Sequence, residues 1–152
     1  MKKINPFFLS LLLSICFCFS AVQASTPTNS SIKITEAWVR ASVPGQTVGA
    51  AYMTLTSVKN VTLVSVESSA ADSVEIHNMS MNNGVMKMRM LDKLDLTAGK
   101  PYKLAPGGFH FMLFDLRQPL KAGEKINFTL HFKDKANKTS AVKVTVPVKA
   151  DQ

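Results

Sequence analysis

Cysteine is almost absent from this sequence of 152 residues. Its two cysteines, Cys16 and Cys18, both lie in an apolar segment near the start, which we expect to be removed. The remaining chain would then contain no disulfide and no thiolate ligand, so its hydrophobic core must hold it together. The same absence argues against a blue-copper electron-transfer centre, because that centre needs a cysteine thiolate.

Acidic residues and enzyme signatures are also scarce. The chain has 10 acidic and 18 basic residues, with a net charge of +8, but its lysines are spread out and form no run. This pattern disfavours a nucleic-acid partner and favours a solvated basic surface that suits an acidic partner protein. No Gly-x-Ser-x-Gly elbow, phosphate-binding loop or His-Glu-x-x-His motif occurs, so we expect a protein that is not an enzyme.

The first residues have the pattern of a secretory signal. Lys2 and Lys3 form a charged start, residues 7–19 are almost wholly apolar, and Val22-Gln23-Ala24 resembles a cleavage sequence. The apolar run is too short for a comfortable membrane span. We therefore expect export to the periplasm with cleavage after Ala24 and no stable membrane insertion afterwards. The expected parts are a signal peptide at 1–24, a flexible leader at 25–31 and one domain at 32–152.

After the leader, short segments of β-type sequence alternate with turn signals. The β-rich segments are residues 32–35, 50–55, 61–66, 74–77, 86–90, 109–114, 126–132 and 142–148. The turn signals are Pro44-Gly45, Asn82-Asn83-Gly84, Ala98-Gly99-Lys100-Pro101, Pro106-Gly107-Gly108 and Ala122-Gly123. No stretch shows a sustained helical period. Several short strands with regular turn chemistry predict an all-β fold, an antiparallel sandwich or barrel.

Methionine and histidine gather in one part of the chain. Six of the eight methionines lie between residues 79 and 112, and His77 and His110 bracket most of that stretch. In the alternating segment 109–113, the two phenylalanines and the leucine would face the core. His110 and Met112 would then share the opposite face, where a role as metal ligands explains a methionine that lies outside the core.

The Asn-Asn-Gly turn at 82–84 predicts a hairpin that brings His77 near Met88 or Met90. If the first two residues of the turn form the loop, His77 lies opposite Met88. If the last two form it, His77 lies opposite Met90, and Met88 becomes its diagonal neighbour. Residues directly opposite have Cβ atoms roughly 4.5–5.5 Å apart, so either register brings His77 and Met88 near one ion. The sequence pattern does not choose between Met88 and Met90.

Two histidines with one or two methionines form a soft nitrogen–sulfur site. Imidazole and thioether without thiolate favour copper(I) over zinc. Thioethers have no proton to lose near neutral pH, so copper(I) binding would depend on pH only through the histidines. A site filled by four protein ligands also leaves no open position for a substrate.

The spacing of His77, Met88, His110 and Met112 resembles the motif of the PCuAC family of periplasmic copper chaperones. Ten residues separate the first pair, twenty-one the second and one the third. The neighbouring segments 74–77, 84–89 and 104–113 are similar as well, within a likeness that runs from about Ala37 to Phe132.

This resemblance implies a cupredoxin-like β-sandwich that binds one copper(I) ion. By the same resemblance, the ligands are His77, Met88, His110 and Met112. It further implies delivery of copper to the dinuclear centre in subunit II of cytochrome c oxidase, alongside a Sco-type thiol protein. The expected function is therefore that of a periplasmic copper chaperone in cytochrome c oxidase assembly.

Two alternatives stay open at this point. One is a secreted β-sandwich binding module whose methionines are packing residues, and the other is a copper-dependent redox enzyme. His131 is expected on the surface and Trp38 in the core. The remaining methionines of the cluster are interpreted as auxiliary ligands or a docking patch: Met79, Met81, Met86 and Met90.

Overall fold

The computed structural model describes residues 31–150. The signal peptide predicted for 1–24, with both cysteines, and most of the leader predicted for 25–31 lie outside the described residues. Every regular element in the described range is a strand. The ten strands are β1 (Ile32–Arg40), β2 (Val48–Ser57), β3 (Val61–Ser68), β4 (Ala71–Asn82), β5 (Val85–Leu91), β6 (Leu94–Leu96), β7 (Pro101–Leu104), β8 (Phe109–Leu116), β9 (Lys125–Asp134) and β10 (Thr139–Lys149).

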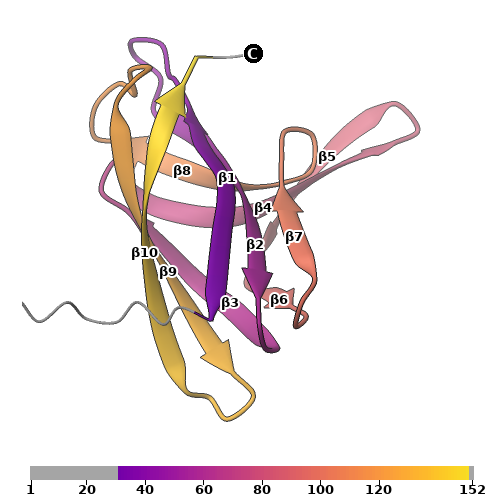
Figure 1. Cartoon of the computed structure of the whole chain (residues 1–152). Helices are drawn as coiled ribbons and strands as arrows, with labels where there is room; N and C mark the ends of the chain where they lie inside the picture. The colour runs from indigo at the N-terminus through magenta and orange to yellow at the C-terminus, as the bar shows by residue number, and fades with distance from the viewer. Residues whose placement is uncertain (1–30, 151–152) are drawn as a thin grey trace, which may run out of the picture.

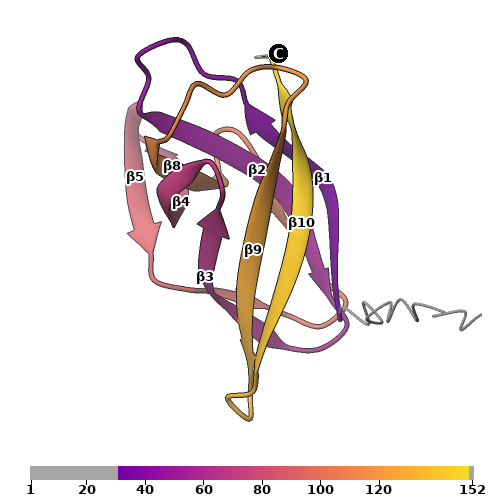
Figure 2. The same ribbon diagram turned by 90° about the vertical axis from the view of Figure 1, so that its left-hand side faces the viewer.

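The strands form one sheet that closes on itself into a barrel (Figures 1 and 2). Around the ring the order is β4, β8, β2, β1, β10, β9 and β3, and the pairing of Val66 in β3 with Val74 in β4 completes it. Strands β5, β6 and β7 pair with β4, β3 and β2, respectively. The all-β prediction is confirmed, although β1 and β10 run parallel to each other, whereas an antiparallel sheet was expected.

Residues that alternate along the ring strands fill the interior of the barrel. Phe111 and Leu113 of β8 are completely buried, and so are Leu130 and Phe132 of β9. These are the inward positions that the alternation of segments 109–114 and 126–132 predicts. The side chains on the opposite face of β8 point away from the core. Core packing therefore does not restrict which residues occur there.

Turns occur at the five places where the sequence predicts them. In each turn a glycine has a positive φ, which glycine adopts without the strain that a Cβ atom would cause. The five are Gly45, Gly84, Gly99, Gly107 and Gly123, with φ between 74° and 91°. Strands β6 and β7 were missed by the sequence reasoning, because they have only three and four residues and show too little alternation.

A β-bulge in β1 changes which side chains face the core. The register with β2 shifts between Thr35 and Trp38, and Glu36 within this shift has a φ of 52°. The extra residue reverses the alternation, because side chains two apart share a face only in an uninterrupted strand. Trp38 is consequently outside the core, where it packs on Tyr52 with ring centroids 4.5 Å apart. The expectation that Trp38 anchors the core was wrong for this reason.

Candidate metal centre

The two predicted histidines lie directly opposite each other on neighbouring strands. His77 of β4 pairs with His110 of β8, so both side chains project from the same face of the sheet. Their ring centroids are 5.8 Å apart. Residues 33 positions apart in the sequence are thus neighbours because β4 and β8 are adjacent in the ring. We call this side of β1, β2, β4, β5 and β8 the site face.

Met112 lies on the site face two residues beyond His110. It pairs with Glu75 of β4 on one side and with Ala50 of β2 on the other. The small side chain of Ala50 leaves space above β2, and this space belongs to a pocket of about 270 Å³. The shared face of His110 and Met112, which the alternation of their segment predicts, is therefore confirmed.

The hairpin of β4 and β5 settles the register that the sequence leaves open. Asn83 and Gly84 have φ values of 50° and 77°, as a two-residue turn of type I′ requires at its central positions. His77 consequently pairs with Met90, and Met88 pairs with Met79. Met88 is the diagonal neighbour of His77, which is the second of the two registers considered from the sequence.

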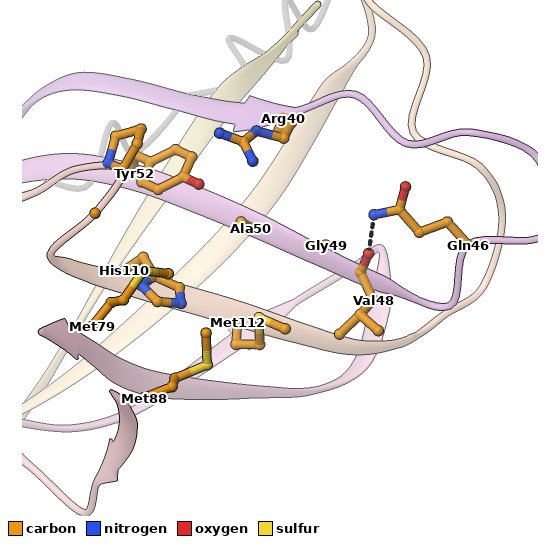
Figure 3. Close-up of a pocket in the computed structure, with 12 residues that line it drawn as sticks. Arg40, Gln46, Val48, Gly49, Ala50, Tyr52, Met79, Met88, His110 and Met112 are labelled. Atoms are coloured by element: carbon orange, nitrogen blue, oxygen red, sulfur yellow. Dashed lines mark hydrogen bonds between the residues drawn. The ribbon is translucent and has the colours of Figure 1, made fainter. Parts of the chain in front are cut away.

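Figure 3 shows the pocket on the site face, between β2, β8 and the hairpin. His110, Met112, Met79 and Met88 project into it together. His77 is not among the residues that line the pocket; it is buried, with its side chain 11% exposed, and its ring packs beside His110 and Phe114. Three of the four predicted ligands therefore meet in an open pocket, while the fourth lies in the wall next to it.

The ring of His110 has a fixed orientation. Its Nδ1 atom is 3.0 Å from the carbonyl oxygen of Gly108, which can only accept a hydrogen bond. Nδ1 must therefore carry the proton, and Nε2 retains the lone pair. Metal-binding histidines typically donate their second ring N–H to an acceptor in this way, which fixes the tautomer.

The ring of His77 is fixed by the opposite nitrogen. Its Nε2 atom is 2.7 Å from a carboxylate oxygen of Glu75, which lies two residues earlier on the same face. Nε2 donates to the carboxylate, so Nδ1 holds the lone pair. That Nδ1 atom is buried and has no hydrogen-bond partner among residues 31–150. An unpaired buried acceptor costs stability, and a metal ion bound to Nδ1 would satisfy it.

The four predicted ligands differ in burial. His110 is 4% exposed, and Met112 is half-buried. Met88, in contrast, is 47% exposed on β5. Within residues 31–150, no three residues among His, Cys, Asp and Glu lie close enough to hold an ion together. Among the residues that line the pocket, Met79, Met88 and Met112 carry thioether sulfur that could add to the nitrogen ligands of the histidines.

Three features of the site face were not found by sequence reasoning. Tyr52 of β2 lies beside His110, with ring centroids 6.4 Å apart, and the guanidinium carbon of Arg40 lies 5.7 Å from the centre of the Tyr52 ring. Arg40 and Trp38 reach this face because of the bulge at Glu36, which no periodic pattern signals. Glu75 could have been noticed, because it shares the alternation of His77.

His131 lies away from this centre. It is in β9, where it pairs with Ser65 of β3 and Ala141 of β10. Its side chain is 34% exposed, and its Nε2 atom is 3.2 Å from the carboxylate of Glu67. This position agrees with the expectation of an outward-facing histidine outside the site.

Comparison with known proteins identifies a matching family and a similar protein. Residues 32–148 match the model of the LpqE-like family, described as "Putative lipoprotein LpqE-like". The chain is 34% identical to the protein named "Putative lipoprotein Lxx21020" of Leifsonia xyli subsp. xyli, over 92% of this chain and 85% of that protein.

Two solved structures are similar to this one. The copper-bound PCuAC domain from PmoF2 is 28% identical, with a TM-score of 0.63, over 80% of this chain and 94% of that domain. The solution structure of the copper(I) form of DR1885 from Deinococcus radiodurans is 34% identical, with a TM-score of 0.55, over 74% of each chain. From the family match and these structures together, the chain belongs to the LpqE-like family, and its fold is the cupredoxin-like β fold of PCuAC domains.

Proposed function

We propose that this protein is a periplasmic copper(I) chaperone that binds one ion through His77, Met88, His110 and Met112. One observation carries the proposal: two buried, adjacent histidine rings are each held by an acceptor at one nitrogen. Each ring thus offers its other nitrogen, beside a pocket that two of the methionine side chains line. The two similar structures, a copper-bound domain and a copper(I) form, support the same metal.

The charge of the site favours copper(I) over divalent ions. Two neutral imidazoles and two neutral thioethers add no charge, and the one carboxylate, that of Glu75, is accompanied by the positive guanidinium of Arg40 at the pocket. The site therefore has no excess of negative charge with which to balance a divalent ion. Thioether sulfur suits copper(I), whereas zinc(II) gains little from a neutral soft ligand.

A carrier must release its ion, and the position of Met88 suits release. β5 is an edge strand that pairs only with β4, and the Met88 side chain is about half exposed. An acceptor protein could replace this ligand first, while the two histidines still hold the ion. Four protein ligands leave no position for a substrate, which supports a carrier rather than a copper-dependent redox enzyme.

The acceptor would be the dinuclear copper centre in subunit II of cytochrome c oxidase, with a Sco-type thiol protein acting alongside. This part of the proposal rests on the PCuAC resemblance alone. A transfer assay would test it: the copper(I)-loaded protein should pass its ion to an apo subunit II domain. Retention of the ion by the chaperone at equilibrium would contradict this delivery role.

Export supplies the compartment for such transfer. The expected signal peptide, cleaved after Ala24, supports it, as does the lipoprotein name of the relative from Leifsonia xyli. Among residues 31–150, the structure contains no helix that is long and apolar enough to cross a membrane. Mass spectrometry of the exported protein should show Ser25 as the first residue, and an intact N-terminus in the membrane fraction would contradict the predicted cleavage.

X-ray absorption at the copper edge tests the ligand set, because it separates nitrogen from sulfur neighbours. The copper(I) protein should have both in its first shell, and the Met88→Ala Met112→Ala double variant should have a changed first shell, because only the other methionines near the pocket could then supply sulfur. His131→Ala is the matched control, since it removes a histidine outside the pocket. A first shell without sulfur in the unmodified protein would contradict the assignment of methionine ligands.

A further inference from the structure

Four methionines of the β4–β5 hairpin are exposed to solvent. Their exposed fractions run from 47% to 66%, whereas Met53 in the barrel core is 1% exposed. Gap-filling in a core is the usual role of methionine, and it applies to Met53 but not to the hairpin. The four exposed methionines are Met81, Met86, Met88 and Met90.

The register arranges these side chains as a ladder. Met90 lies opposite His77, Met88 opposite Met79, and Met86 opposite Met81. Alternation puts all six side chains on the site face. Successive rungs are two residues apart, which is roughly 7 Å along a strand. Soft ligands thus run without interruption from the buried histidines to the tip of the hairpin.

The outer rungs repeat the relation that the proposed copper site uses. His77 and Met88 are diagonal neighbours across the hairpin, one on each strand. Met79 and Met86 are diagonal neighbours in the same direction, one rung further out. Met81 lies directly opposite Met86, at a Cβ separation of roughly 4.5–5.5 Å. Three thioethers therefore stand within reach of one another without using any ligand of the inner site.

The outer part of the hairpin extends beyond the barrel wall. The last pair between β4 and β8 joins Asn78 to Phe109, and the amide of Met79 then donates to the carbonyl of Gly108 at 3.0 Å. From Ser80 onward, β4 pairs only with β5, and the hairpin projects away from the body in Figure 1. An ion held on this part would be accessible to a partner protein.

The chemistry of the hairpin selects for soft cations. Residues 76–91 contain no aspartate, glutamate or cysteine, and the two charged residues, Lys87 and Arg89, are basic. Alternation directs both basic side chains to the face opposite the methionines. Hard cations such as calcium and magnesium need oxygen ligands, so only a metal that accepts neutral thioether sulfur suits this ladder.

We propose that Met79, Met81 and Met86 form an outer copper(I) site, at which the ion is held as it enters or leaves the inner site. The part concerning entry and exit rests on the proposed function, whereas binding at the outer site does not. The ion moves by exchange of neutral ligands, and copper stays in the +1 state throughout. No oxidant, reductant or proton is needed.

The test uses protein labelled with ¹³C at the methionine methyl groups, titrated anaerobically with copper(I). The first equivalent should shift the methyl signals of Met88 and Met112, and the second those of Met81 and Met86, which lie outside the pocket that Met79 shares with the inner site. In the Met81→Leu Met86→Leu variant, the second equivalent should be lost, while affinity for the first stays within twofold. Release of the inner ion to a bulky chelator should slow several-fold in this variant.

A matched control adds a methionine without rebuilding the site. Val85 is 57% exposed at the hairpin tip, and alternation directs it to the opposite face. Val85→Met in the double-leucine background should restore neither the second equivalent nor the release rate. Restoration by this change would overturn the outer site, because any exposed thioether would then suffice.

The two proposals fail in different ways. Absence of a second equivalent in the unmodified protein, or its survival in the double-leucine variant, overturns the outer site. Loss of the second equivalent with an unchanged release rate overturns its role in entry and exit. Absence of shifts at Met88 and Met112, with shifts at Met81 and Met86 retained, overturns the inner site and leaves outer binding intact.

Discussion

The proposed metal centre has a rigid half, on β4 and β8, and a flexible half, on β5, and the two are built in different ways. His77 and His110 lie on strands paired on both sides, are nearly buried, and have each ring fixed by a hydrogen bond. Met88 lies on an edge strand and is half exposed. Its side chain is flexible, because it has three rotatable bonds. The difference suggests a division of labour: the rigid half positions the ion, and the flexible half exchanges it.

Removing a buried side chain beneath β8 should cause the largest loss of stability in the rigid half. Phe111 lies between His110 and Met112 in β8, and it is completely buried. Phe111→Ala should lower the free energy of unfolding by about 3–5 kcal/mol, because it leaves a cavity under the strand that carries both ligands. Denaturant unfolding measures this loss. Met88→Ala is the comparison, and a loss there above about 0.5 kcal/mol would contradict the view that Met88 contributes little to packing.

Removing a ligand from the rigid half should cost affinity without costing the fold. Changes to groups that merely orient a metal ligand typically weaken binding about 10–100-fold, so His110→Ala should weaken copper(I) binding by more than about 100-fold. Met88→Ala should have a smaller effect, since neighbouring thioethers of the hairpin can replace it. Competition with a copper(I) chelator gives both values. Equal losses would remove the distinction between the two halves.

Glu75 should matter through the orientation of His77. Glu75→Leu removes the acceptor for Nε2 and should weaken copper(I) binding about 10–100-fold. Glu75→Gln keeps an acceptor oxygen and loses only the charge, so its loss should be smaller. If both variants bind copper(I) as tightly as the unmodified protein, the fixed ring of His77 has no role in the site.

A change in the turn of the β4–β5 hairpin tests whether the hairpin can be destabilised without affecting β8. Gly84 has a φ of 77°, so Gly84→Ala strains the turn and should destabilise the hairpin by about 1 kcal/mol. The amides of β5 should exchange with solvent faster, whereas those of β8 should be unchanged. Faster exchange in both strands would mean that the two halves unfold together.

The smallest effect concerns a turn far from the metal centre. Backbone hydrogen bonds, first that from Lys138, and the ammonium of Lys59 hold the pKa of Asp134 below its usual value of 3.8. The charged carboxylate therefore stabilises the fold above about pH 4, and this contribution is lost as the pH falls through the lowered pKa. The stability difference between the protein and Asp134→Asn should shrink between pH 6 and pH 3, with copper(I) affinity at pH 6 unchanged.

Local patterns predicted much of this molecule. The alternation of 109–113 predicts both the buried phenylalanine and the shared face of His110 and Met112, and the Asn-Gly turn narrows the hairpin to two registers. Contacts between distant strands are a different matter. No periodic pattern in the sequence indicates that β4 and β8 are neighbours, so the family resemblance alone placed His77 and His110 in one ligand set, and their direct pairing was not predicted.

Irregular backbone conformation was the second feature, after the pairing of distant strands, that the sequence reasoning did not predict. The bulge at Glu36 reverses the alternation of β1, so that Trp38, which was expected in the core, lies on the site face together with Arg40. One residue with a left-handed conformation thus changed the surroundings of Tyr52, the residue next to His110. The role of the four ligands remains a prediction, because geometry alone does not identify a bound ion.

The free edge of β5 has a consequence for self-association. An edge strand with exposed apolar side chains offers unpaired backbone groups to a second copy of the chain. Lys87 and Arg89 interrupt the methionines on this edge, so two β5 strands brought together would place four positive charges in a small area. This repulsion opposes pairing between two β5 edges, and it weakens at high ionic strength, where charges are screened. The basic residues between the methionines therefore disfavour self-association through β5, the strand that must stay exposed for the proposed copper exchange.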